Sequence, residues 1–84
     1  MNIKLCFFAR FREKLAISEE VYTLNSASTV KQLFQQLAQR GEVWSSIFDG
    51  SQNVLVAINQ DMATLTSLIS EGDEVAFFPP VTGG

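Results

Sequence analysis

The feature that most constrains the fold of this chain is a single amphipathic segment with strand-like segments on both sides of it. Its apolar residues fall on one face of a helix, at positions Val30, Leu33, Phe34, Leu37 and Ala38. Polar side chains fill the other face, so the sequence predicts a helix over residues 29–40, with Ser28 as its N-cap and Gly41 just beyond its C-terminus. Because one such helix cannot bury its apolar stripe alone, the flanking segments predict a sheet for it to pack against.

Four segments around this helix have the composition of β-strands. They are rich in β-branched and aromatic residues and are bounded by turn-forming clusters, and they cover residues 2–8, 20–24, 53–59 and 74–78. The segment 43–48 is apolar but irregular, and 65–69 fits either a short edge strand or a 3₁₀ turn. We expect the second strand to run antiparallel to the first. The first and last strands are the most evenly apolar, so they should pair at the centre of one mixed sheet with the helix on one face.

The composition excludes several classes of site. The 84 residues include no histidine, which removes imidazole bases and histidine metal ligands. The single cysteine, Cys6, excludes an internal disulfide and any CxxC zinc or redox motif. The five glycines form neither a phosphate-binding loop nor a dinucleotide fingerprint. The formal net charge of −3 argues against a general nucleic-acid binder, which would normally carry a basic face.

The sequence also indicates a compartment. Its longest apolar runs, such as Val54–Ile58, are far shorter than the ~18 residues of a membrane-spanning helix. The N-terminal residues lack the pattern of a signal peptide. We therefore expect a cytoplasmic protein with no membrane or nucleic-acid partner.

Cys6 and an acidic turn carry side chains that could react or bind a metal. Cys6 lies in the middle of an apolar strand, where a cysteine is usually an inert packing residue rather than a sulfur relay. Glu71, Asp73 and Glu74 place three carboxylates in one turn. Such a group without further ligands is usually exposed, so we expect no metal site there and prefer docking to a basic patch on a partner.

The segment 9–15 is the most basic part of the chain. It fits a helical turn, because Phe11 and Leu15 are four residues apart. Arg10, Arg12 and Lys14 supply half of the six basic residues. They either contact a phosphate group or an acidic partner, or form a solvated charged turn.

The most specific motif is the C-terminal sequence Phe-Phe-Pro-Pro-Val-Thr-Gly-Gly, residues 77–84. This ending resembles that of the small subunit of molybdopterin synthase, a ubiquitin-like sulfur carrier. Segments 4–9, 56–60 and 73–77 are similar to the same family, whereas 43–52 match it only loosely. The resemblance and the order of elements together imply an α+β fold of the β-grasp type, with a domain over residues 1–78 and a flexible tail over 79–84.

The resemblance also implies a mechanism. In that family, an activating enzyme uses ATP to adenylate the terminal carboxylate, which becomes a thiocarboxylate and gives its sulfur to a cyclic pyranopterin precursor of molybdopterin. Carried over to this chain, the reacting residue is Gly84. Gly83, Thr82, Val81 and Pro80 would thread into the large subunit of a heterotetramer. The chain itself would bind no cofactor and no metal, and would supply no enzyme active site of its own.

Two further residues are expected to contact these partners. Alternation along the last strand directs Phe77 and Phe78 to opposite faces of the sheet. We expect Phe78 and Met62 to form an apolar patch on the side away from the helix, next to the exit of the tail. Methionine is an adaptable contact residue, which suits a protein that meets both an activating enzyme and a synthase subunit.

Two other functions compete with this interpretation. Carriers for thiamine synthesis or tRNA thiolation and ubiquitin-like protein modifiers also end in Gly-Gly. A non-covalent β-grasp interaction module would have an incidental tail, and a tag added to its C-terminus would leave it active.

Overall fold

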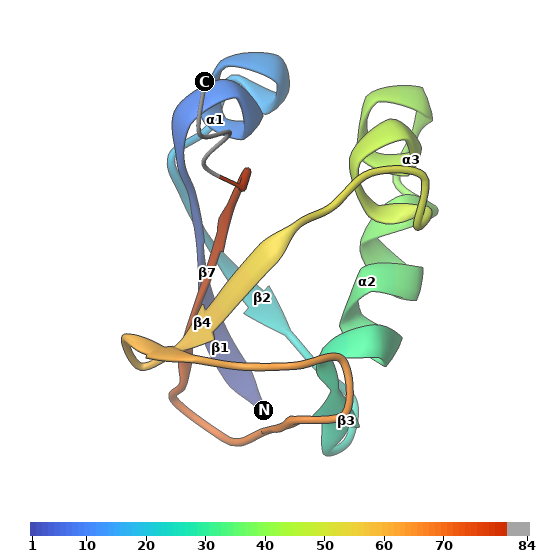
Figure 1. Cartoon of the computed structure of the whole chain (residues 1–84). Helices are drawn as coiled ribbons and strands as arrows, with labels where there is room; N and C mark the ends of the chain where they lie inside the picture. Colours follow the sequence, from blue (N-terminus) through green and yellow to red (C-terminus); the bar gives the residue numbers. More distant parts are fainter. Residues whose placement is uncertain (81–84) are drawn as a thin grey trace.

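The computed structural model describes residues 1–80, which form a five-stranded mixed sheet with helices over one of its faces (Figure 1). In chain order the elements are β1 (Asn2–Phe7), α1 (Ala9–Leu15), β2 (Glu19–Thr23), β3 (Ser28–Thr29), α2 (Val30–Ala38), α3 (Glu42–Phe48), β4 (Leu55–Ile58), β5 (Asp61–Met62), β6 (Leu68–Ile69) and β7 (Glu74–Phe78). The strand order is β2-β1-β7-β4-β5, and β3 pairs with β6 in a small second sheet. This is the β-grasp arrangement that the sequence predicts.

The first and last strands are neighbours at the centre of the sheet, as expected. β1 and β7 are parallel, with Leu5 opposite Val75 and Phe7 opposite Phe77. β2 returns antiparallel along the other side of β1. Because β1 and β7 run in the same direction, the chain enters α1 and leaves β7 at the same end of these two central strands.

The core lies between this sheet and α2. Large side chains from β1 and β7 and the apolar stripe of α2 are almost fully buried there; they are Ile3, Leu5, Phe7, Val75, Phe77, Val30, Leu33 and Leu37. The rings of Phe7 and Phe77 stack with their centroids 5.5 Å apart. Phe34, which the helical stripe also predicts to be buried, is only partly buried at the margin of the core.

Both ends of α2 differ from the sequence prediction. Its N-cap is Thr29, whose hydroxyl accepts the Gln32 backbone N–H while the Gln32 side chain accepts the Thr29 N–H, which makes a capping box. Ser28 belongs instead to β3, and its buried hydroxyl donates to the Ser26 carbonyl. Gly41 is the N-cap of α3 rather than the end of α2, and its φ of 148° explains why a glycine stands there.

The helix α3 occupies the segment that looked irregular in the sequence. Trp44, Ile47 and Phe48 have the spacing of one helix face, but seven residues are too few to give a clear period. Its rings complete the core, since Phe48 meets Phe77 edge to face at 5.1 Å. Tertiary packing therefore decides this segment rather than its own pattern.

The Arg40 side chain links β2 to α3 through contacts that the sequence analysis did not predict. Its guanidinium lies over the ring of Trp44, 4.4 Å from the centroid, and 5.5 Å from that of Tyr22. Both of its Nη atoms donate to the Glu20 carboxylate, and this pairing raises the pKa of Arg40.

Candidate functional site

The face of the sheet opposite the helices is the candidate site. Residues paired in register across a sheet point to the same side. Cys6 of β1, Ala76 of β7, Ala57 of β4 and Met62 of β5 are paired in this way and form one row. Phe78 and Leu55 form the next row, and Phe8 adds a ring whose centroid is 6.5 Å from that of Phe78. We call these seven side chains the outer face.

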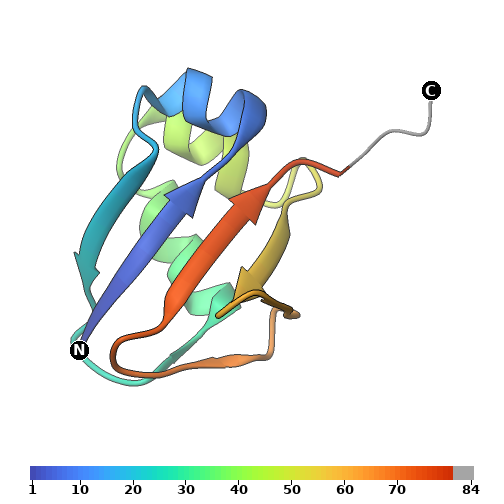
Figure 2. The ribbon, with the colours of Figure 1, turned by 90° about the vertical axis from the view of Figure 1, so that its left-hand side faces the viewer.

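Among residues 1–80, no element covers the outer face, although it is apolar. In Figure 2 it is turned toward the viewer with the helices behind it, and no helix or strand of residues 1–80 crosses it. Met62 is 63% exposed and Phe8 47% exposed. Small residues occupy the middle of the face, whereas longer side chains border it. Such a surface fits the apolar side chains of a partner protein.

The last described residues leave the sheet beside this face. β7 ends at Phe78, and Pro79 and Pro80 follow, both partly buried. A proline has no N–H to donate, so the strand cannot continue its ladder there. The Phe8 backbone N–H still reaches the Phe77 carbonyl at 3.1 Å, which fixes the start of α1 next to this exit.

The structure brings together only some of the predicted site residues. Gly84, Gly83, Thr82 and Val81 lie outside the described residues, whereas Pro80 stands at the exit. Phe78 and Met62 both lie on the outer face, as expected. Phe78 is beside the exit, but Met62 is two strands away on β5, so the patch is wider than the sequence suggested. Their contact with partners stays a prediction.

The surroundings of Cys6 do not activate its thiol. The side chain is 6% exposed and lies in the row of small residues on the outer face. Burial raises the pKa of the thiol, and the nearby Glu74 carboxylate raises it further. Because the thiolate is the nucleophilic form, this environment suits a packing residue.

The carboxylates of the acidic turn accept hydrogen bonds that hold the loop between β6 and β7 in place. The Glu71 carboxylate accepts the Asn2 N–H at 2.9 Å, and Asp73 accepts the Ser70 N–H at 2.8 Å. Asp73 also accepts the Asn59 side-chain amide at 2.9 Å, which ties this turn to the β4–β5 hairpin. Among residues 1–80, no three histidine, cysteine, aspartate or glutamate residues gather as a metal-binding group.

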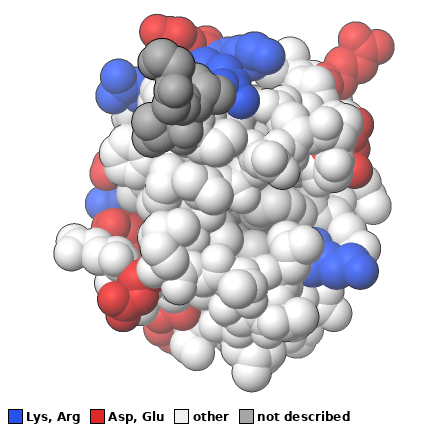
Figure 3. All heavy atoms as spheres, viewed as in Figure 1, with Lys and Arg blue, Asp and Glu red and all other residues white. Residues whose placement is uncertain are grey.

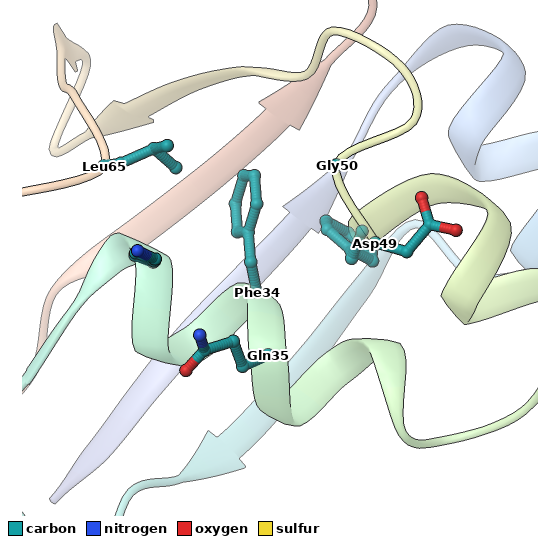
Figure 4. Close-up of a pocket in the computed structure, with 7 residues that line it drawn as sticks. Phe34, Gln35, Asp49, Gly50 and Leu65 are labelled. Carbon is teal, nitrogen blue, oxygen red and sulfur yellow. The ribbon is translucent and has the colours of Figure 1, made fainter.

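A pocket on the helical side escaped the sequence analysis. It has a volume of about 180 Å³. Phe34, Phe48 and Leu65 provide its apolar lining, and Gln35 and Asp49 lie at its margin (Figure 4). Its only sequence signals were one residue of the apolar stripe, Phe34, and the ambiguous segment at 65–69. The pocket is on the far side of the sheet from the outer face.

Comparison with known proteins defines the class. A family model described as the ThiS family matches residues 5–84. The described residues have the β-grasp fold of SAMP1 from Haloferax volcanii, with a TM-score of 0.82 and 26% identity over the whole of both chains. The chain belongs to the ThiS family.

Individual relatives have more specific names than the family. The molybdopterin synthase sulfur carrier subunit of Haemophilus influenzae is 38% identical over 98% of this chain and 99% of its own length. A solved complex of subunits 1 and 2 of the molybdopterin-converting factor from Helicobacter pylori contains the same fold, with a TM-score of 0.68 and 24% identity over the full length of both chains. No helix in residues 1–80 of the present chain is long and apolar enough to cross a membrane.

Proposed function

We propose that this chain is the sulfur-carrier subunit of a molybdopterin synthase, acting in the cytoplasm. The observation that carries the proposal is the full-length match, at 38% identity, to a curated carrier of that function. Geometry adds support, since the chain leaves a central strand at the rim of an apolar face that no helix or strand of residues 1–80 covers. A carrier needs both a surface that docks and an end that reaches beyond it.

In this function, Gly84 supplies the only reacting group of the chain. Its carboxylate oxygen attacks the α-phosphorus of ATP held by the activating enzyme, and pyrophosphate leaves. A sulfur nucleophile then attacks the acyl carbon and AMP leaves, which gives the thiocarboxylate. The thiocarboxylate sulfur then attacks a carbon of the pyranopterin precursor, from which an oxygen leaving group departs. Water attacks the acyl carbon, the acyl C–S bond breaks, the sulfur stays on the pterin and the Gly84 carboxylate is restored. The cations that stabilise the phosphate charge come from the partner.

The remaining tail residues deliver this group. Gly83 and Gly84 lack Cβ atoms, so they can enter a channel that excludes larger residues. From Phe78 to Gly84 an extended chain reaches ~20 Å at ~3.3–3.6 Å per residue. The prolines at the base of the tail reduce the entropy lost when it enters the large subunit.

The test is activation and sulfur loading of full-length variants. With the activating enzyme, ATP and a sulfur source, the native chain should gain the mass of one oxygen-to-sulfur exchange. Removal of Gly84 shifts the carboxylate by ~3.5 Å, and even ~1 Å can cost ~100-fold in rate. We therefore expect neither this variant nor a chain with one residue added after Gly84 to support ATP–pyrophosphate exchange. Activation of the untrimmed longer chain at the native rate would refute the mechanism.

The likeness to SAMP1, a small archaeal modifier protein, favours one alternative, a protein modifier. Such a modifier would pass the same activated Gly84 to a lysine amine. Complementation of a strain that lacks its molybdopterin synthase carrier distinguishes the two. Restored cofactor synthesis without lysine conjugates supports the carrier, and the reverse result supports the modifier. If the chain neither restores cofactor synthesis nor forms lysine conjugates, and a C-terminally tagged chain still binds its partner, the result supports a non-covalent module.

A further inference from the structure

Five of the six basic residues of this chain fall into two groups with different surroundings, and the sixth, Lys31, is exposed on α2. Lys4 pairs with Glu19 at 3.0 Å, and Arg40 pairs with Glu20. In contrast, Arg10, Arg12 and Lys14 on α1 are exposed and have no ion pair among the described residues. Among the described residues Arg10 has neutral partners: it donates to Gln52 Oε1 at 3.1 Å, and its guanidinium lies over the Phe11 ring, 5.3 Å from the centroid.

This helix carries a charge opposite to that of the remaining molecule. It holds three cations and one carboxylate, Glu13, so its formal charge is +2. The other residues include three basic and eight acidic side chains, which gives −5. In Figure 3 blue side chains gather at the top of the molecule, where Figure 1 places α1, with red atoms beside them; other red side chains lie at the upper right and the lower left.

The position of α1 links this charge to the exit of the tail. The helix begins directly after Phe8, whose N–H donates to the Phe77 carbonyl at 3.1 Å. Phe8 also meets Phe78 edge to face on the outer face. The cations are thus held beside the point at which the chain leaves the domain, at the border of the apolar surface that a partner would cover.

The directions of the three cations indicate the shape of the partner. Arg10 and Lys14 are four residues apart and share one side of the helix, whereas Arg12 lies on the other side. They diverge, so they do not converge on one phosphate group. Divergent cations match an extended surface that bears several carboxylates.

We propose that α1 is a cationic docking helix, which binds an acidic protein surface around the entrance of the site that receives the tail. The proposal rests on the carrier function proposed above. An acidic surface is repelled by the −5 charge elsewhere on the chain and attracted at α1. The end of the domain from which the tail leaves therefore meets the partner first. Such steering acts mainly on the association rate and weakens as salt is added.

The first experiment measures association of the full-length chain with the large subunit of the molybdopterin synthase of the same organism, from low to high ionic strength. A triple variant, Arg10→Gln with Arg12→Gln and Lys14→Gln, should associate about tenfold more slowly at low salt. It should also lose most of its salt dependence, with dissociation changed less than twofold. Circular dichroism verifies that the variant is folded.

A matched pair separates position from net charge. Lys14→Gln and Lys31→Gln each remove one exposed cation without an ion pair among the described residues, but Lys31 lies on α2, beside the pocket of the helical side. Lys14→Gln should slow association at low salt at least twofold, whereas Lys31→Gln leaves it unchanged. Equal effects, or an unchanged rate in the triple variant, would overturn the proposal.

A second experiment keeps the inference testable if the large subunit does not bind at all, a result that would contradict the carrier function alone. Poly-L-glutamate is titrated into the isotopically labelled chain at low salt, and tripolyphosphate into a separate sample. Backbone shifts concentrated in residues 9–15 with poly-L-glutamate support the acidic surface. Shifts there with tripolyphosphate only, or shifts spread equally to Lys31 and its neighbours, refute it.

Discussion

On the inner face of the sheet, large side chains such as Leu5, Phe7 and Phe77 are fully buried beneath the helices, whereas on the outer face the same strands present small or half-exposed apolar residues. Each buried Leu or Phe contributes about 1.5–3 kcal/mol, so the inner face accounts for the stability of the domain. The outer face contributes far less to folding and yet remains apolar. The comparison teaches that packing beneath the helices explains why the inner face is apolar but does not explain why the outer face is, and contact of the outer face with a partner stays a prediction.

The largest expected effect contrasts two consecutive residues of β7. Phe77→Ala removes a fully buried ring and should lower the free energy of unfolding by ~3–5 kcal/mol, which is about all that so small a domain has. Phe78→Ala removes a half-buried ring from the outer face and should cost about 1 kcal/mol, near the value of one aromatic pair. Urea denaturation followed by circular dichroism measures both. Equal losses would mean that the two faces do not differ in this way.

The next effect concerns partner binding by the outer face. Met62→Asp places a charge on a 63% exposed residue and should weaken binding to the large subunit at least tenfold, about 1.4 kcal/mol, because the charge must be desolvated. Leu68→Asp is the matched control, since Leu68 is 69% exposed but belongs to β6, outside the outer face. Calorimetry should show unchanged affinity for that control. If the two variants bind equally well, Met62 is not part of the interface.

The sequence predicted the inner face of the sheet far better than the short elements and the ends of the helices. A strand such as 2–8 alternates Ile3, Leu5 and Phe7 with other residues, and that period directly specifies which side is buried. α3 escaped prediction because seven residues scarcely define a helical period. Ser28 was the wrong N-cap because the next residue, Thr29, is also a suitable capping residue and is the one that caps α2. Short elements depend on tertiary contacts, which local patterns do not contain.

The candidate site was predictable only in part. The C-terminal motif indicated the reacting residue, and alternation separated Phe78 from Phe77. The row of small residues through Ala57 and Ala76 depends on the register of three strands, which no segment encodes alone. The contrast between the cations of α1 and the paired Arg40 likewise required the positions of carboxylates distant in sequence.

A smaller effect tests how well the outer face shields Cys6. Burial raises the pKa of its thiol above the ordinary 9.0, so the thiolate is scarce at neutral pH. Alkylation by iodoacetamide should be slow in the folded chain, with a midpoint above pH 9.0, and should become faster when urea unfolds it. A folded-state midpoint below that value would instead identify an activated thiol and reopen a role in sulfur transfer.

The smallest expected effect comes from Lys4, a charged residue at the margin of the outer face. Its ammonium lies 3.0 Å from the Glu19 carboxylate, and this hydrogen bond raises the pKa of Lys4 above 10.5. Because the folded chain then binds the proton more tightly than the unfolded chain, the pair stabilises the fold below about pH 10.5 and loses this effect as the pH rises further. Lys4→Gln should therefore lower stability slightly at neutral pH, and the difference from the native chain should vanish in strong alkali.

Exposure keeps this effect small, because water and salt screen the pair. The raised pKa of Cys6 gives an alkaline loss of the same sign, so both chains in this comparison should carry Cys6→Ala. Thermal unfolding at neutral and alkaline pH then isolates the lysine. A difference that grew with pH would contradict the assigned direction, and a loss as large as that of Phe77→Ala would show that charges on the outer side, and not only the buried rings, hold the sheet together.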